Sequence, residues 1–176
     1  MWPSTRSLAA GLVVCIAVPL TACNGAGMLS SFGDGPAALE LPALELPATV
    51  DAYPDGEVLQ VAKTQFAAGN FGHAARYYER AVEIAPKNPE AWLGLAASYD
   101  RVRRFDLADR AYREAGLLIG NRPEYYNNVG YSYLLRGDVA KARTNFLRAY
   151  ELDPASATVN NNLELLRDGI SRSKKT

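Results

Sequence analysis

Apolar residues between positions 55 and 171 recur at spacings of three and four, which is the period of an amphipathic α-helix. The same arrangement of large, small and polar residues returns every 34 residues, in the segments 55–88, 89–122 and 123–156. Large residues occupy the fourth and twenty-fourth positions of this period, and small residues the eighth, twentieth and twenty-seventh. In that order the columns hold Val58, Trp92 and Tyr126; Tyr78, Tyr112 and Phe146; Ala62, Ala96 and Gly130; Ala74, Ala108 and Ala142; and Ala81, Ala115 and Ala149.

The period predicts two helices in each segment, because small residues let two helices approach closely while an aromatic ring fills the adjacent gap. Turn residues separate the two helices as Gly69-Asn70 and Gly137-Asp138, with Arg103-Arg104 as an atypical turn in the second segment. Pro89 and Pro123 suit the first turn of a helix, where the missing N–H is not needed. We therefore predict an all-α solenoid of three helix pairs.

Residues 157–171 continue the register and then lose the second helix of the pair. Leu163, Leu166 and Ile170 form one apolar stripe there. Repeat arrays need a helix with a polar outer face at their open end, so we predict a C-terminal capping helix at 157–171. The basic residues of 172–176 form a tail after it.

The repeated columns resemble the tetratricopeptide repeat (TPR) over about 100 of the 176 residues. Gln65 stands where that repeat usually has an aromatic residue, and Gly120 stands where it usually has proline. The resemblance implies a domain that binds other proteins on a concave groove, lined by the first helix of each pair. The groove positions read Leu59, Lys63 and Phe66; Glu90, Leu93, Ala97 and Asp100; Glu124, Asn127, Tyr131 and Leu134; and Asn161 and Leu165 in the cap.

This expected groove is mainly apolar, with Lys63 as its one lysine. TPR domains that clamp the acidic tails of chaperones use lysine and asparagine at the positions of Leu59 and Lys63, so that mode is set aside. An apolar groove suits an amphipathic helix or an extended peptide with apolar side chains. Leu134 is expected on the binding face and outside the core, so that Leu134→Glu should leave folding intact.

Asparagines recur one period apart, at 127–128 and 160–162. An asparagine amide can bond both the N–H and the C=O of a bound peptide, so Asn127 and Asn161 could form a ladder along the groove. The alternative is that these side chains are merely solvated.

The first 22 residues predict a signal peptide, because Arg6 precedes an apolar run from Leu8 to Leu20 that is too short to cross a bilayer comfortably. The run ends in Leu20-Thr21-Ala22-Cys23, which resembles the lipobox of bacterial lipoproteins. That resemblance implies lipidation of Cys23, and two or three acyl chains anchor a protein stably. An ordinary secretory cleavage site with a chance cysteine is the alternative. Asn24 follows the cysteine, in place of the aspartate typical of inner-membrane retention, and so favours the periplasmic face of the outer membrane.

Residues 23–54 predict a tether between the lipid and the folded domain, since glycines and prolines interrupt any helix there. The sequence Leu-Glu-Leu-Pro-Ala occurs twice in tandem, at 39–43 and 44–48. A stiff spacer is one interpretation of this repetition. Docking of its leucines on a hydrophobic surface, in this chain or on a partner, is the other.

Composition excludes several classes of function. Nineteen basic and nineteen acidic residues give a formal net charge of zero, which argues against nucleic-acid binding. One histidine and two cysteines, none of them in a metal-binding spacing, predict no metal site and no cofactor. His73 is expected on an outer helix face, and no catalytic set accompanies it, so an enzyme is not expected. Arg101, Arg103 and Arg104 form either a solvated turn or a basic patch for anionic lipid or peptidoglycan.

Residues 125–166 carry a more specific likeness, in the run beginning Tyr-Asn-Asn-Val-Gly-Tyr-Ser-Tyr and the closing Asn-Asn-Leu-Glu-Leu-Leu. With the lipobox and the length of three repeats, this resembles the TadD family of TPR lipoproteins in tight-adherence pilus assembly. The resemblance implies a pilotin-like role, binding the secretin subunit of the outer membrane. An adaptor for peptidoglycan enzymes or for outer-membrane protein insertion is the alternative.

Overall fold

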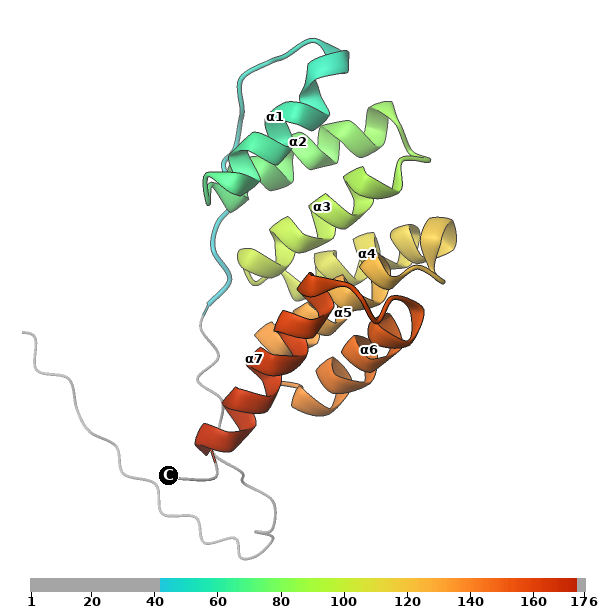
Figure 1. The fold of residues 1–176 in the computed structure, drawn as a ribbon. Coiled ribbons are helices and arrows are strands. Elements are labelled where there is room, and N and C mark those ends of the chain that lie inside the picture. Colours follow the sequence, from blue (N-terminus) through green and yellow to red (C-terminus); the bar gives the residue numbers. More distant parts are fainter. Residues whose placement is uncertain (1–41, 174–176) are drawn as a thin grey trace, which may run out of the picture. The chain divides into compact units, whose positions relative to one another are not determined.

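The computed structural model describes residues 42–173, with side chains through Ser171, and Figure 1 shows its fold. The predicted signal peptide, Cys23, Leu39, Leu41 and the last three residues of the basic tail lie outside the described residues. The described chain is all helical. Its helices are α1 (Asp55–Ala67), α2 (Phe71–Ile84), α3 (Pro89–Arg101), α4 (Phe105–Ile119), α5 (Pro123–Leu135), α6 (Val139–Leu152) and α7 (Ala157–Ser173).

The helices pack as successive antiparallel pairs, α1 with α2, α3 with α4 and α5 with α6. We call these pairs repeats 1, 2 and 3. The first helix of each repeat also packs on the preceding repeat, and α7 packs on α6 and α5. The predicted all-α solenoid of three helix pairs with a capping helix is therefore confirmed. None of the helices in 42–173 is both long and apolar enough to cross a membrane.

Close packing within and between the repeats depends on small residues facing aromatic rings. A Cβ atom on Gly94 would overlap the ring of Tyr78, and one on Gly130 would lie 2.7 Å from Cδ1 of Phe146. The alanines of the small-residue columns are buried against the same rings. This is the close approach that the spacing of small and large residues predicts.

The turn inside each repeat places one residue in the left-handed region of backbone conformation. Gly69 in repeat 1 and Gly137 in repeat 3 have φ angles of 79° and 78°, which glycine adopts without steric cost. Arg103 occupies the same place in repeat 2, with a φ of 61°. The turn that looked atypical in the sequence therefore keeps the same backbone shape with a less suitable residue.

Residues 44–53, which we call the strap, lie against repeats 1 and 2 before α1 begins (Figure 1). The Leu44 N–H donates to the Val102 carbonyl at 2.9 Å, and Arg76 Nε donates to the Pro47 carbonyl at 2.8 Å. Leu46 and Val50 pack on the hydrophobic core. The tether prediction is thus wrong for this stretch, because the chain is already docked from Leu44 onward.

Candidate binding groove

A hollow with a mainly apolar lining lies between α1, α3 and the start of α5, and has a volume of about 460 Å³. Phe66, Leu93, Ala97 and Ile119 contribute apolar surface to it, and Tyr78 lies beside them. A hollow of this kind can accept the apolar side chains of a bound segment. We call it the groove.

Charged residues around the groove are paired with one another. Lys63 Nζ lies 2.7 Å from Glu90 Oε1, and Arg122 Nε lies 3.4 Å from Glu124 Oε2. Burial, followed by the nearby carboxylate of Glu90, raises the pKa of Tyr78 to about 12, so its hydroxyl stays protonated at neutral pH. The groove consequently presents an apolar floor and a rim with no net charge.

Six of the predicted groove positions line this hollow, and four of them are Lys63, Phe66, Leu93 and Ala97. Glu90 and Glu124, which the sequence also placed there, line it as well. Leu59 is half-buried and packs on the core. The sequence did not predict three further lining residues, Tyr78, Ile119 and Arg122. They lie on the second helices or just before α5, whereas the groove was predicted from the first helix of each pair.

Two of the asparagines at 127–128 and 160–162 bond to each other, and a third bonds within its own helix. Asn127 Oδ1 accepts a hydrogen bond from Asn162 Nδ2 at 2.8 Å, while Asn161 is exposed. Asn128 Nδ2 donates to the Glu124 carbonyl in its own helix at 2.8 Å. Asn127 and Asn128 thus each make a bond within the chain, and the ladder of Asn127 and Asn161 along a bound peptide stays a prediction.

Tyr131 and Leu134 are covered by the capping helix, as Leu134 packs in a cluster with Leu166 and Ile170. The expectation that Leu134 lies free on the binding face is therefore wrong. Its position in the repeat faces the next helix pair, and here that neighbour is α7. Leu165, one residue before Leu166, points away and stays 47% exposed.

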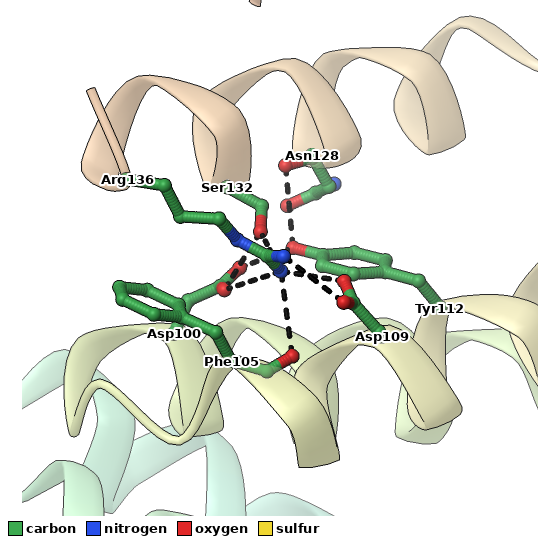
Figure 2. Close-up of polar contacts among 7 residues, drawn as sticks. All are labelled: Asp100, Phe105, Asp109, Tyr112, Asn128, Ser132 and Arg136. Carbon is green, nitrogen blue, oxygen red and sulfur yellow. Dashed lines mark hydrogen bonds and ion pairs between the residues drawn. The ribbon is translucent and has the colours of Figure 1, made fainter. Parts of the chain in front are cut away.

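Asp100 is also absent from the groove, because it is buried between repeats 2 and 3 with only 3% of its surface exposed. Figure 2 shows the polar contacts around it. Ser132 Oγ donates to one carboxylate oxygen at 2.7 Å, and Tyr112 Oη donates to the other at 2.9 Å. The same tyrosine hydroxyl lies 3.2 Å from the Asn128 carbonyl.

Arg136 supplies the positive charge of this cluster. Its guanidinium donates to Ser132 Oγ at 2.9 Å, pairs with Asp109, and lies 3.7 Å from Asp100 Oδ1 (Figure 2). Burial raises the pKa of Asp100 to about 6, against the opposing effect of the bonds from Ser132 and Tyr112 and of the Arg136 charge. The cluster joins repeats 2 and 3, and it borders the groove at Asn128, which also belongs to the groove lining.

The arginines of the α3–α4 turn are engaged with aromatic rings. The Arg101 guanidinium stacks 3.9 Å from the centre of the Phe71 ring, and that of Arg103 lies 5.2 Å from the Phe105 ring. His73 is exposed and lies beside the strap. No cluster of three metal-binding side chains occurs within 42–171.

Comparison with known proteins identifies the repeats. Two family models of the tetratricopeptide repeat match this chain, one over residues 55–98 and the other over 123–156. Human tetratricopeptide repeat protein 7B is 31% identical over 91 residues, which are 52% of this chain and 11% of that protein. The chain thus spans about a tenth of the length of this relative.

Solved structures share the fold at low sequence identity. The second TPR domain of human RPAP3, in complex with an HSP70 peptide, has a TM-score of 0.54 and 17% identity, and the match covers 65% of this chain and 98% of that one. The Yersinia enterocolitica secretion chaperone SycD, in complex with a peptide of the translocator YopD, has a TM-score of 0.54 and 19% identity, covering 64% and 91%.

The helix pairs define the class as an all-α repeat protein. The family models identify residues 55–98 and 123–156 as tetratricopeptide repeats, and the solved TPR domains share the fold of the helix pairs.

Proposed function

We propose that this protein is a lipid-anchored scaffold of the bacterial cell envelope, which holds an apolar segment of a protein partner in the groove. The observation that carries the proposal is the apolar floor formed by Phe66, Leu93 and Ala97, which no segment of the described chain covers. TPR domains bind protein partners, and the proposal assigns that role to this floor.

The charges of the rim specify the kind of segment. Lys63 and Arg122 each already have a carboxylate partner, so a strongly acidic tail would have to displace Glu90 and Glu124. A segment with apolar side chains and few charges makes no such demand. An amphipathic helix or an extended peptide of that composition is therefore the ligand that the groove fits best.

The anchor is proposed from the sequence. Cys23 follows Leu20-Thr21-Ala22 at the end of an apolar run, and its lipidation would hold the domain at the periplasmic face of the outer membrane. Replacing Cys23 with serine should move the protein from the membrane fraction to the soluble fraction. Retention of the Cys23→Ser variant in the membrane would argue for another means of attachment.

The likeness of residues 125–166 to TadD lipoproteins makes a pilotin-like partner the first candidate, that is, the secretin subunit of a tight-adherence pilus system. The alternative is an adaptor for peptidoglycan enzymes or for outer-membrane protein insertion. Both functions use the same groove and anchor, so the identity of the bound protein distinguishes them.

Photo-crosslinking in the native cell envelope tests the partner. A photoreactive residue replaces Lys63, which is exposed on the rim, and a matched control replaces Arg113, which is exposed on α4 outside the groove lining. We expect an adduct at position 63 and none of the same mass at 113, with the partner identified by mass spectrometry. A secretin adduct supports the pilotin-like role, and an adduct with cell-wall enzymes or insertion factors supports the adaptor. Identical adducts at both positions would contradict binding in the groove.

A further inference from the structure

The first part of the strap, residues 44–48, is held by three contacts. Its Leu44 N–H bonds to Val102, its Leu46 side chain packs on the core, and its Pro47 carbonyl accepts from Arg76. The Glu45 side chain is exposed, and so is most of Leu44, whose side chain is 57% accessible. Recognition of residues 44–48 thus depends on one main-chain N–H, one leucine side chain, and one proline with its carbonyl.

The receiving surface on α2 is held in place by contacts that do not involve the strap. Arg76 Nη1 bonds to Glu79 Oε2 at 2.9 Å, and the other oxygen of that carboxylate accepts from Tyr99 Oη at 2.6 Å. Gly72 leaves room for the proline, since a Cβ atom there would lie 3.1 Å from Pro47 Cδ. A fixed donor and a missing side chain together form a site that accepts a proline with a free carbonyl.

Every group that the site contacts between Leu44 and Ala48 also occurs five residues upstream. The sequence at 39–43 is identical to that at 44–48, so Leu39 carries the equivalent N–H, Leu41 the equivalent side chain, and Pro42 the equivalent ring and carbonyl. The contacts that the site makes with residues 44–48 therefore do not distinguish this copy from the one at 39–43.

We propose that the surface formed by α2 and Val102 is a recognition site for the sequence Leu-Glu-Leu-Pro-Ala, and that the two tandem copies of this chain exchange in it. The second copy is the preferred occupant, because Val50 follows it onto the core, whereas a shift by five residues would place Glu45 there. The shift also lengthens the chain between the docked copy and α1 from residues 49–54 to 44–54, and loop closure disfavours this by a factor of about 2.5.

The exchange changes the length of chain between Cys23 and the docked copy. Residues 24–43 separate them when the second copy is bound, and residues 24–38 when the first copy is bound. Five residues correspond to at most about 17 Å of extended chain. With the proposed lipid anchor, the groove would operate at two maximum distances from the membrane. This consequence rests on the proposed function, whereas the exchange itself does not.

Hydrogen exchange of individual amides, measured on the full chain in detergent, tests the exchange without reference to lipidation or partner. In the unaltered protein we expect the Leu44 amide to be protected by its bond to Val102. In Leu46→Asp we expect that protection to fall at least tenfold, and protection of at least tenfold to arise at the Leu39 amide. The matched variant Leu41→Asp should leave Leu44 protected, and the double variant should leave neither amide protected.

A third variant tests the site itself, since Gly72→Val fills the space used by the proline of either copy. We expect both amides to exchange freely in it, with exchange in α5 and α6 unchanged as evidence of folding. Loss of protection at Leu44 in Leu46→Asp with no gain at Leu39 would overturn the proposal. Protection at Leu39 that rises with protein concentration would also overturn it, because the occupant would then be a second copy of the chain.

Discussion

The two interfaces between successive repeats use the same positions with opposite chemistry. Between repeats 1 and 2, Phe66 of α1 packs in the apolar core cluster with Val102 at the end of α3. One period of 34 residues later, Asp100 stands at the position of Phe66 and Arg136 at the position of Val102. Both belong to a buried polar cluster. At these two positions the first interface is apolar and lies beside the groove, whereas the second is joined by hydrogen bonds and ion pairs.

The difference shows that the fold specifies which positions lie between two repeats, but not whether the residues at those positions are apolar or polar. Ser98 and Ser132 are equivalent and both buried, yet Ser98 bonds to the Gly94 carbonyl of its own helix while Ser132 bonds to Asp100 of the preceding repeat. A buried ion pair contributes little net stability over an apolar pair of similar volume, but it becomes costly when one partner is removed. The polar interface should therefore tolerate paired replacement and resist single replacement.

The largest expected effect comes from removing the cation of the polar interface. Arg136→Val leaves the Asp100 carboxylate buried without its positive neighbour, and we expect a loss of about 3 kcal/mol in the free energy of unfolding at pH 7. Urea unfolding followed by circular dichroism measures it. The double variant Asp100→Phe/Arg136→Val copies the residues of the first interface and should recover most of the loss. A double variant as unstable as the sum of its single variants would show that the two interfaces are not interchangeable.

The pH dependence of stability should reveal the same carboxylate. The folded-state pKa of Asp100 is raised to about 6 from an ordinary 3.8, in a cluster that also contains Arg136, Asp109 and Tyr112. Between these values the folded protein binds more protons than the unfolded one, so this contribution is full below about pH 4 and is lost as the pH rises through 6. The whole loss amounts to about 3 kcal/mol, of which about 2 kcal/mol falls between pH 4 and pH 7.

Asp100→Asn is the control for that measurement, because its side chain does not titrate. Subtracting the unfolding free energy of the variant from that of the unaltered protein, at pH 4 and at pH 7, isolates the contribution of Asp100. We expect the difference to fall by about 2 kcal/mol on going to pH 7. A difference that is constant with pH would mean that Asp100 titrates normally.

The contact of repeat 3 with the cap gives a third interface of apolar type, formed by Leu134, Leu166 and Ile170. Leu134→Glu places a charge among them, so we expect a loss of about 2 kcal/mol in the free energy of unfolding. Leu165→Glu is the matched control on the exposed side of the same cap, where a change below about 0.5 kcal/mol is expected. Equal losses in the two variants would place Leu165 in the packed interface as well.

These interfaces also mark the extent to which the sequence predicts the molecule. The spacing of small and aromatic residues predicts the helix pairs, because that pattern acts locally and within one repeat. It also places Phe66, Leu93 and Ala97 on a common face. The groove prediction was wrong for Asp100 and Leu134, which occupy the twelfth position of repeats 2 and 3. The side chain at this position faces the helices that follow, which are those of repeat 3 for Asp100 and α7 for Leu134. Asp100 and Arg136 did differ in type from the apolar residues one period before them, which is the signal that could have revealed the cluster.

The strap was harder to predict, since its docking depends on contacts far apart in the chain. Arg76 reaches Pro47 across 29 positions, and Leu44 bonds to the carbonyl of Val102 in another repeat. Neither contact has a periodic signature. Docking of the leucines was one of two interpretations of the tandem Leu-Glu-Leu-Pro-Ala copies, but only the arrangement of α2 and α3 shows on which surface the second copy docks.

The smallest expected effect concerns the turn of repeat 2, where the comparison of repeats makes an unusual residue visible. Arg103 adopts the left-handed φ that Gly69 and Gly137 adopt in the other repeats, at a steric cost that glycine avoids. We expect Arg103→Gly to raise the free energy of unfolding by about 0.5–1 kcal/mol, reduced by the loss of the contact between Arg103 and the Phe105 ring. Thermal and urea unfolding measure the gain, with Gly137→Arg as the reciprocal variant and an expected loss of similar size. A destabilised Arg103→Gly would mean that the aromatic contact outweighs the backbone cost.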